Sequence, residues 1–251
     1  MGEVVRVDGL VNAKYARVLC YPTPTEEEVK RRVEELKRLG VEALEFAGGK
    51  QVGNIKLLGK GFAGVVVLAH LRDGSLAALK IRRVDAPTHK LMKEADALRM
   101  ANRVGVGPKL LGATENLLLM EYIQGVNLPQ WVKNVENPEL IRRTLRTLLT
   151  KCRRLDEIGL DHGELSWAPK HVIVDGSGEP CIIDFESASD RRRPSNVTSI
   201  SQYLFIRSQV AETLAEKLGK VPREALLDAL REYKRNPTEE KFQAILRVCR
   251  L

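Results

Sequence analysis

The sequence predicts an α+β protein with two lobes, a β-rich N-terminal half and a mainly helical C-terminal half. Residues 51–81 contain apolar, strand-like runs on either side of an Asp-Gly pair, a pattern that favours a β-hairpin. Residues 140–158 repeat apolar side chains at helical spacing, and Gly159 is placed to end that helix. In the β-rich lobe a single helix is expected, at 88–104, and three helices are expected from about residue 197 onward. The length of 251 residues suffices for two lobes with an adequate core.

A short α/β leader is expected ahead of the β-rich lobe. Thr25-Glu26-Glu27-Glu28 has the form of a capping box, and the helix that it begins should end at Gly40. Residues 41–46 are typical of a short strand, and Gly48-Gly49 separates this leader from the glycine-rich strand region. The expected divisions are an N-terminal α/β extension at 1–49, an N-terminal lobe at 50–123 and a C-terminal lobe at 124–251.

The composition is that of an ordinary globular protein with a basic surface. The formal net charge is +8, so an acidic partner such as a nucleotide, an RNA or a phosphorylated protein is plausible; a merely solvated Lys/Arg surface is the equally weighted alternative. The one basic cluster is Arg191-Arg192-Arg193. The four cysteines lack C-x-x-C spacing, which indicates neither zinc nor a disulfide framework. No signal-peptide core and no membrane-length apolar run is present, so we expect a cytoplasmic protein without a membrane partner.

The most informative motif is a glycine-rich run at 59–66 with the pattern G-x-G-x-x-G-x-V. A dinucleotide-binding loop would continue directly into a helix. Here Val65–Ala69 is strand-like and Asp73-Gly74 favours a tight type I′ turn, so a β-hairpin should cover the phosphates. The glycines let backbone N–H groups approach phosphate oxygens without obstruction by a Cβ atom. Lys80, at the end of the second strand, would neutralise phosphate charge.

Four acidic residues could supply the other groups that phosphoryl transfer from ATP needs. Glu94, in the expected helix 88–104, is the candidate counter-charge for a buried Lys80, although a solvated helix residue is the alternative interpretation. Asp184 ends an apolar strand, which makes it a candidate magnesium ligand rather than a turn residue. The segment Asp161-His162-Gly163-Glu164 follows the long helix and offers a carboxylate for the acceptor hydroxyl.

Over residues 51–190 these motifs resemble the protein-kinase-like superfamily. The resemblance is strongest to small atypical archaeal kinases: the RIO type, the kinase of the tRNA-modifying KEOPS complex, and predicted archaeal serine/threonine protein kinases. It implies a bilobal kinase-like fold that binds ATP and Mg²⁺, with Mn²⁺ as an alternative metal. It also implies that Met120 is the gatekeeper and that the backbones of Glu121 and Ile123 bind adenine, although a plain core strand is the alternative. The implied cofactor-binding positions are Gly59, Lys60, Gly61, Phe62, Gly64, Val66, Ala78, Lys80, Glu94, Met120, Glu121 and Ile123.

The resemblance breaks down at the catalytic loop. Glu164 stands where the family has aspartate. The implied catalytic residues are Glu164 and Lys80, and Asp161 is the rival of Glu164 for the role of catalytic acid. Pro169 occupies the position of the metal-binding asparagine, and an insertion would bring His171 into that slot. Imidazole binds magnesium poorly and manganese better, so the metal ligands become Asp184 and His171. No A-P-E motif is present after Asp184, so a typical activation loop is not expected.

The function predicted from these features is that of an atypical serine/threonine protein kinase that transfers the γ-phosphate of ATP to a protein hydroxyl, its own included. One alternative is a nucleotide-binding pseudokinase or ATPase module that acts on RNA or a ribonucleoprotein, which the altered catalytic loop and the basic charge favour. Another is a small-molecule kinase, because His-Gly-Glu and Asp-Phe-Glu resemble the aminoglycoside and choline kinase branch. Only 67 residues follow Asp184, which leaves little room for that branch's acceptor-binding insertion.

Overall fold

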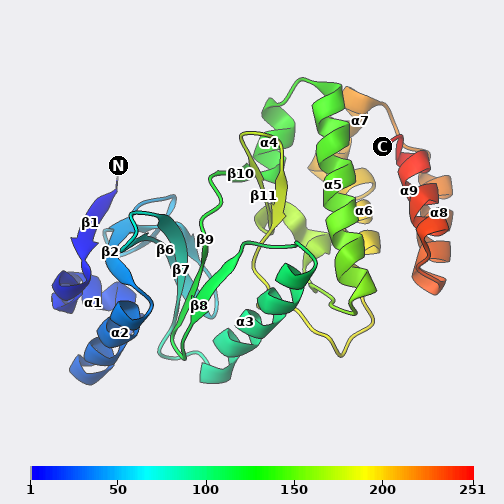
Figure 1. Ribbon diagram of the computed structural model, residues 1–251. Helices are drawn as coiled ribbons and strands as arrows, with labels where there is room; N and C mark the ends of the chain where they lie inside the picture. Colours follow the sequence, from blue (N-terminus) through cyan, green and yellow to red (C-terminus); the bar gives the residue numbers. More distant parts are fainter. Residues whose placement is uncertain (1) are drawn as a thin grey trace. The chain divides into compact units, whose positions relative to one another are not determined.

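The computed structural model describes residues 2–251 and has the predicted α+β architecture (Figure 1). The chain forms two compact units. The first comprises the residues up to 99 together with 108–122, and the second comprises 100–107 together with 123–251. None of the helices described is both long enough and apolar enough to cross a lipid bilayer.

The first unit is built on an antiparallel sheet of seven strands. Its main order is β1 (Glu3–Arg6), β2 (Val41–Phe46), β6 (Gly64–Leu71), β7 (Leu76–Arg82), β9 (Leu117–Glu121) and β8 (Leu110–Ala113). The short strand β5 (Gly59–Lys60) pairs with β6, and β3 (Lys50–Val52) pairs with β4 (Ile55–Leu57) in a separate hairpin. The leader therefore contributes two strands to the same sheet that carries the glycine-rich run.

The leader also covers one face of this sheet with helices. These are the 3₁₀ helix η1 (Val7–Val11), α1 (Ala13–Leu19) and α2 (Glu26–Arg38). The predicted cap at the start of α2 is confirmed, because the Thr25 hydroxyl accepts a hydrogen bond from the Glu28 amide. Leu36 of α2 belongs to the same buried cluster as Leu79 and Ile81 of β7. Apolar burial thus joins the leader to the central strands.

The predicted hairpin between β6 and β7 forms, but the predicted turn type is wrong. A type I′ turn needs a positive φ at both central residues. Gly74 has φ +82, whereas Asp73 keeps a negative φ. The Gly74 amide donates to the Leu71 carbonyl at 3.0 Å, and the Leu71 amide donates to the Ser75 carbonyl at 2.9 Å. The connection is therefore a longer loop in which glycine takes the left-handed position after the turn.

The second unit is mainly helical, as predicted. Its helices are α4 (Leu128–Asn134), α5 (Pro138–Glu157), η2 (Leu165–Lys170), α6 (Asn196–Phe205), α7 (Gln209–Leu218), α8 (Arg223–Arg235) and α9 (Glu239–Cys249). A three-stranded sheet has the order β10 (Gly125–Asn127), β11 (Val172–Asp175) and β12 (Pro180–Ile182). The predicted long helix corresponds to α5, whose apolar face is buried, and Gly159 comes after it with φ +76.

The C-terminal segment contains four helices in the described chain, not the three predicted. The additional break falls between α6 and α7, at residues 206–208. Ser208 caps α7 by accepting from the Ala211 amide, and its hydroxyl donates to the Tyr203 carbonyl of α6 at 2.6 Å. A serine that bonds to both helices ends one and starts the next, which the apolar periodicity alone does not reveal.

Candidate active site

The glycine-rich run folds as a tight hairpin, as predicted. Gly59 and Lys60 of β5 pair with Val66 and Val65 of β6, and the Gly61 amide donates to the Gly64 carbonyl at 2.8 Å. A Cβ atom at Gly64 would lie 2.7 Å from the Ile81 carbonyl oxygen. Gly64 is therefore required by the close approach of β7.

The tip of the hairpin presents side chains outward. Phe62 is exposed at the turn, where the ammonium group of Lys90 lies 5.1 Å from its ring centroid. The Lys60 side chain contacts Tyr21, and its ammonium group lies 4.8 Å from the centroid of the Tyr21 ring. Both contacts are cation–π interactions with aromatic faces.

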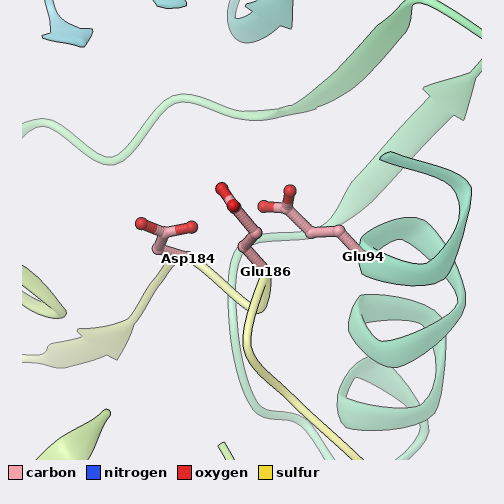
Figure 2. A group of neighbouring side chains, drawn as sticks. All are labelled: Glu94, Asp184 and Glu186. Atoms are coloured by element: carbon pink, nitrogen blue, oxygen red, sulfur yellow. The ribbon is translucent and has the colours of Figure 1, made fainter. Parts of the chain in front are cut away.

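Lys80 and Glu94 form a buried ion pair. Lys80 Nζ lies 2.7 Å from Glu94 Oε2 and 2.9 Å from Oε1, and the two side chains are only 7% and 4% exposed. Lys80 comes from β7 and Glu94 from α3 (Thr88–Arg103), where Figure 2 shows the carboxylate projecting from the helix. The predicted pairing is confirmed as a contact. The attraction between the two charges offsets the free-energy cost of burying them, and this compensation is lost when either charge is removed.

The register of the sheet places the predicted nucleotide-contacting side chains on one face. Val66 opposes Lys80, and Ala78 opposes Met120. Opposed residues of an antiparallel pair share a face, and so do residues two apart on one strand. Helix α3 packs on that same face through Leu91 and Ala95 against Leu118.

The strand end after Met120 carries the predicted adenine contacts. The Glu121 amide donates to the Lys109 carbonyl at 2.8 Å, and its side chain accepts from the Lys109 amide at 3.0 Å. Any adenine contact from Glu121 would consequently use its carbonyl group. Ile123 begins the second unit, after the end of β9.

In the second unit, Glu164 is held by two polar side chains. Its Oε2 lies 2.9 Å from His171 Nε2, and its Oε1 accepts a hydrogen bond from the Ser187 hydroxyl at 2.5 Å. The Glu164 side chain nevertheless remains 43% exposed. His171 is buried and its Nδ1 has no hydrogen-bond partner within the described chain, so its role as a metal ligand stays a prediction.

Asp161, the rival acid, is more deeply engaged. Its carboxylate accepts from the Ser195 amide at 3.1 Å and lies 3.1 Å from Nε of Arg192, with the side chain 10% exposed. Its backbone forms a two-way bridge with Ser189. These contacts describe a carboxylate that braces the loop, whereas Glu164 presents more of its surface to solvent.

His162 is a buried residue of the same loop, and nothing in the sequence indicated a role for it. Its amide donates to Asn196 Oδ1 at 2.8 Å, and its Nε2 lies 3.0 Å from the Ile183 carbonyl. Because a carbonyl only accepts, the neutral ring carries its proton on Nε2. Burial lowers the pKa of His162, which favours that neutral form. Asn196 in turn donates to Asp156 at 2.8 Å, so the first turn of α6 anchors the loop to α5.

Asp184 has an uncommon backbone conformation. Among residues 2–251, only Asp184 and Arg250 are non-glycine residues with positive φ, and Asp184 has φ +66. Left-handed backbone at a non-glycine residue costs free energy and is often found at functional sites. The segment after β12 also carries Glu186, and its carboxylate oxygen lies within 4.8 Å of that of Asp184 (Figure 2). Two carboxylates at this spacing fit Mg²⁺ or Mn²⁺, which prefer oxygen ligands.

Comparison with known proteins identifies the family. The RIO domain model matches residues 72–202, more than half of the chain, and the chain belongs to this family of atypical, kinase-like proteins. RIO proteins form an atypical family of ATP-binding phosphotransferases. The matched region contains Lys80, Glu94, Glu164 and Asp184, while the glycine-rich run precedes it. The chain is also similar to an uncharacterized protein of Methanocaldococcus jannaschii, with 27% identity over 100 residues, which are 40% of this chain and 84% of that protein.

Proposed function

We propose that this protein is an ATP-dependent atypical serine/threonine kinase that transfers the γ-phosphate of ATP to a protein hydroxyl, its own included. The observation that carries the proposal is the buried Lys80–Glu94 pair in a chain of the RIO family. A buried ion pair is often no more stable than an apolar replacement. Its presence here is better explained by a task for the lysine, and in kinases the equivalent pair must be in place for phosphoryl transfer.

The first unit would bind the nucleotide. Backbone N–H groups of the hairpin between Gly59 and Gly64, other than the Gly61 amide that already donates to the Gly64 carbonyl, would contact phosphate oxygens, and Lys80 would neutralise their charge. Ala78 and Met120 would line the adenine, because both lie on the same face of the sheet as Lys80.

The second unit would supply the metal ligands and the acceptor carboxylate. Asp184 and Glu186 would hold Mg²⁺ or Mn²⁺, with His171 as a further candidate, and the ion would neutralise charge on the phosphates. Glu164 would orient the acceptor hydroxyl and take its proton. A carboxylate has about four acceptor positions, so the contacts with His171 and Ser187 leave capacity for a substrate hydroxyl. Asp161 would brace the loop.

A nucleotide-binding ATPase or pseudokinase module that acts on RNA or a ribonucleoprotein is the second candidate. The observation in its favour is that both oxygens of Glu164 already contact the protein's own side chains. The basic cluster gives it less support, since Arg192 pairs with Asp161 and Arg193 donates to the Lys234 carbonyl. RNA binding through phosphates should weaken steeply as salt is raised. An affinity for RNA that is flat between low and moderate salt would count against this candidate.

The kinase proposal is tested with labelled ATP and either Mg²⁺ or Mn²⁺. We expect labelled protein in wild type and none in Asp184→Ala. Released phosphate without labelled protein would instead favour the ATPase of the second candidate. Asp228→Ala, an exposed position on α8, serves as the matched control and should behave as wild type. Retained ATP binding without turnover in either metal would replace the kinase proposal with the second candidate.

The two acids are separated by their amide variants. Glu164→Gln should lower turnover far more than ATP affinity, because the amide cannot take a proton. Asp161→Asn should instead destabilise the loop through its contacts with Ser195 and Arg192. Normal turnover in Glu164→Gln together with a catalytic loss in a well-folded Asp161→Asn would reverse the assignment.

A further inference from the structure

We propose that Ser187 is a phosphorylation site of this protein, modified within the same chain with Glu164 as the base. This inference rests on the proposed kinase function and names its first acceptor. Ser187 comes directly after the two carboxylates proposed as metal ligands, Asp184 and Glu186, on the same segment.

The hydrogen bond from Ser187 to Glu164 differs from the other serine–carboxylate contacts of the chain. The long-range bond from the Ser195 hydroxyl to Asp161 is longer, at 3.3 Å. Ser75 donates to Asp73 at 2.6 Å and Ser177 donates to Asp175 at 2.7 Å, but each of these bonds spans two residues inside a turn. Such local contacts are what Asp and Ser commonly form in turns. The Ser187 hydroxyl instead reaches a carboxylate 23 residues away in sequence, so turn geometry does not account for it.

The geometry is that of an acceptor hydroxyl on its base. A general base must lie within hydrogen-bond reach of the proton that it removes, and Ser187 Oγ is 2.5 Å from Glu164 Oε1. His171 fixes the other oxygen of the carboxylate, at 2.9 Å from its Nε2. Since the carboxylate can only accept, His171 donates this bond and thereby directs Oε1 toward the serine.

A cationic side chain lies beside the proposed site. Arg192 donates to the Ser187 carbonyl at 2.6 Å while its Nε pairs with Asp161. Guanidinium groups have five N–H donors and bind phosphate oxygens in pairs. Arg192 can therefore offer hydrogen bonds to a phosphate on Ser187 after a small rearrangement of its side chain.

The reaction balances with ATP as the only co-reactant. Ser187 Oγ forms a bond to the γ-phosphorus, and its proton passes to Glu164. The bond between the γ-phosphorus and the oxygen that bridges it to the β-phosphate breaks, and ADP leaves with that electron pair. Glu164 then releases the proton to solvent. Phosphoserine carries roughly two negative charges, and because no hydroxyl proton remains at Ser187, each chain is modified once at this position.

The test follows the position of the label in four proteins incubated with γ-labelled ATP and metal. Mass spectrometry should find phosphoserine at Ser187 in wild type and no label there in Ser187→Ala. Ser187→Thr should carry phosphothreonine at the same position, which a purely structural hydroxyl would not produce. Ser177→Ala, which removes a comparable serine–carboxylate bond, should be labelled as wild type. The labelled fraction per unit time should not change with protein concentration, because the acceptor Ser187 and the base Glu164 lie in one chain.

Several results would overturn the inference. One is unchanged labelling of Ser187→Ala, and another is a Ser187 labelling rate that grows with protein concentration. A third is a Ser187→Thr protein that phosphorylates an added protein acceptor but carries no label itself, since Ser187 would then only position Glu164. In each of these cases ADP is still formed and the kinase proposal stands. If wild type binds ATP but forms no ADP, both proposals fail together.

Discussion

Replacing Lys80 with methionine should destabilise the first unit even without any nucleotide. The substitution keeps much of the side-chain length of lysine and removes its charge, so that the Glu94 carboxylate loses the lysine's charge at a site that is 4% exposed. Breaking a buried ion pair by removing one partner costs about 3–5 kcal/mol, whereas exposed pairs contribute about 0–1 kcal/mol. The low exposure of both side chains places this pair in the first class.

The double variant separates charge from packing. When Glu94→Leu is added to Lys80→Met, the charge of the Glu94 carboxylate is removed as well, and much of the lost stability should return. The thermodynamic cycle should thus report a coupling of about 2 kcal/mol or more between the two positions. ATP binding should be lost in both variants, because both lack the lysine charge that we propose to neutralise the phosphates.

Hydrogen exchange of peptides from β7 and α3 is the appropriate assay. Both tryptophans, Trp131 and Trp167, lie in the second unit, so their fluorescence does not report directly on the first. A loss of about 3 kcal/mol corresponds to roughly 100-fold faster exchange of amides that open with the unit. Asp96→Asn is the matched control, because the Arg99–Asp96 pair lies on the same helix with side chains 49% and 67% exposed. Equal effects of Lys80→Met and Asp96→Asn would refute the assignment of Lys80–Glu94 as a desolvated pair.

Three further predictions concern the hairpin, the catalytic loop and the leader. Gly64→Ala should lower the free energy of unfolding in urea by about 1–3 kcal/mol, because its Cβ would lie 2.7 Å from a backbone oxygen. Gly61→Ala should be neutral, because its Cβ would meet its nearest neighbour at 3.7 Å. Equal unfolding midpoints of the two variants would contradict this prediction. Burial lowers the pKa of His162 below 6.5. Its contribution to stability is therefore complete above pH 6.5 and is lost at lower pH, where the unfolded chain binds the proton more readily than the folded one. His162→Phe should flatten that part of the plot of unfolding midpoint against pH, and an unchanged plot would exclude His162 as the cause. Arg32→Met should lower the thermal midpoint of the first unit, because the fully buried guanidinium donates to the Leu19 carbonyl at 2.7 Å; an unchanged midpoint would show that the bond contributes nothing net.

Local patterns predicted the elements that depend on local chemistry. The capping box at Thr25 gave the start of α2, and the glycine spacing gave the hairpin. The Lys80–Glu94 contact was predictable although it joins a strand to a helix, because the spacing of the motif implied it. The turn after β6 was mispredicted because an Asp-Gly pair is compatible with more than one loop length, and cross-strand pairing decides among them.

The polar contacts that hold the loop of Asp161, His162 and Glu164, which we propose to be catalytic, were not predictable in the same way. Asn196, Ser195 and Ser187 contact the loop across 23 to 34 residues of sequence, and no local pattern links them to it. In the sequence, Glu186 appears only as the glutamate of Asp-Phe-Glu, at the position where protein kinases have the glycine of a D-F-G motif. The structure brings its carboxylate near that of Asp184, so the same departure adds an oxygen ligand to the proposed metal site.

The two faces of the first unit's sheet differ in their surroundings, and from this difference we expect the leader to be needed for nucleotide binding. Val66, Lys80 and Met120 occupy one face, which the nucleotide proposal requires to be accessible. The alternate residues, such as Leu79, point to the other face and are fully buried. In the described chain that burial comes largely from the leader, whose Leu36 lies in the same cluster. Without residues 1–49 a large apolar surface would be exposed, which favours aggregation. The leader is therefore part of the structure that holds Lys80 in position, and a protein that begins at residue 50 should not retain ATP binding.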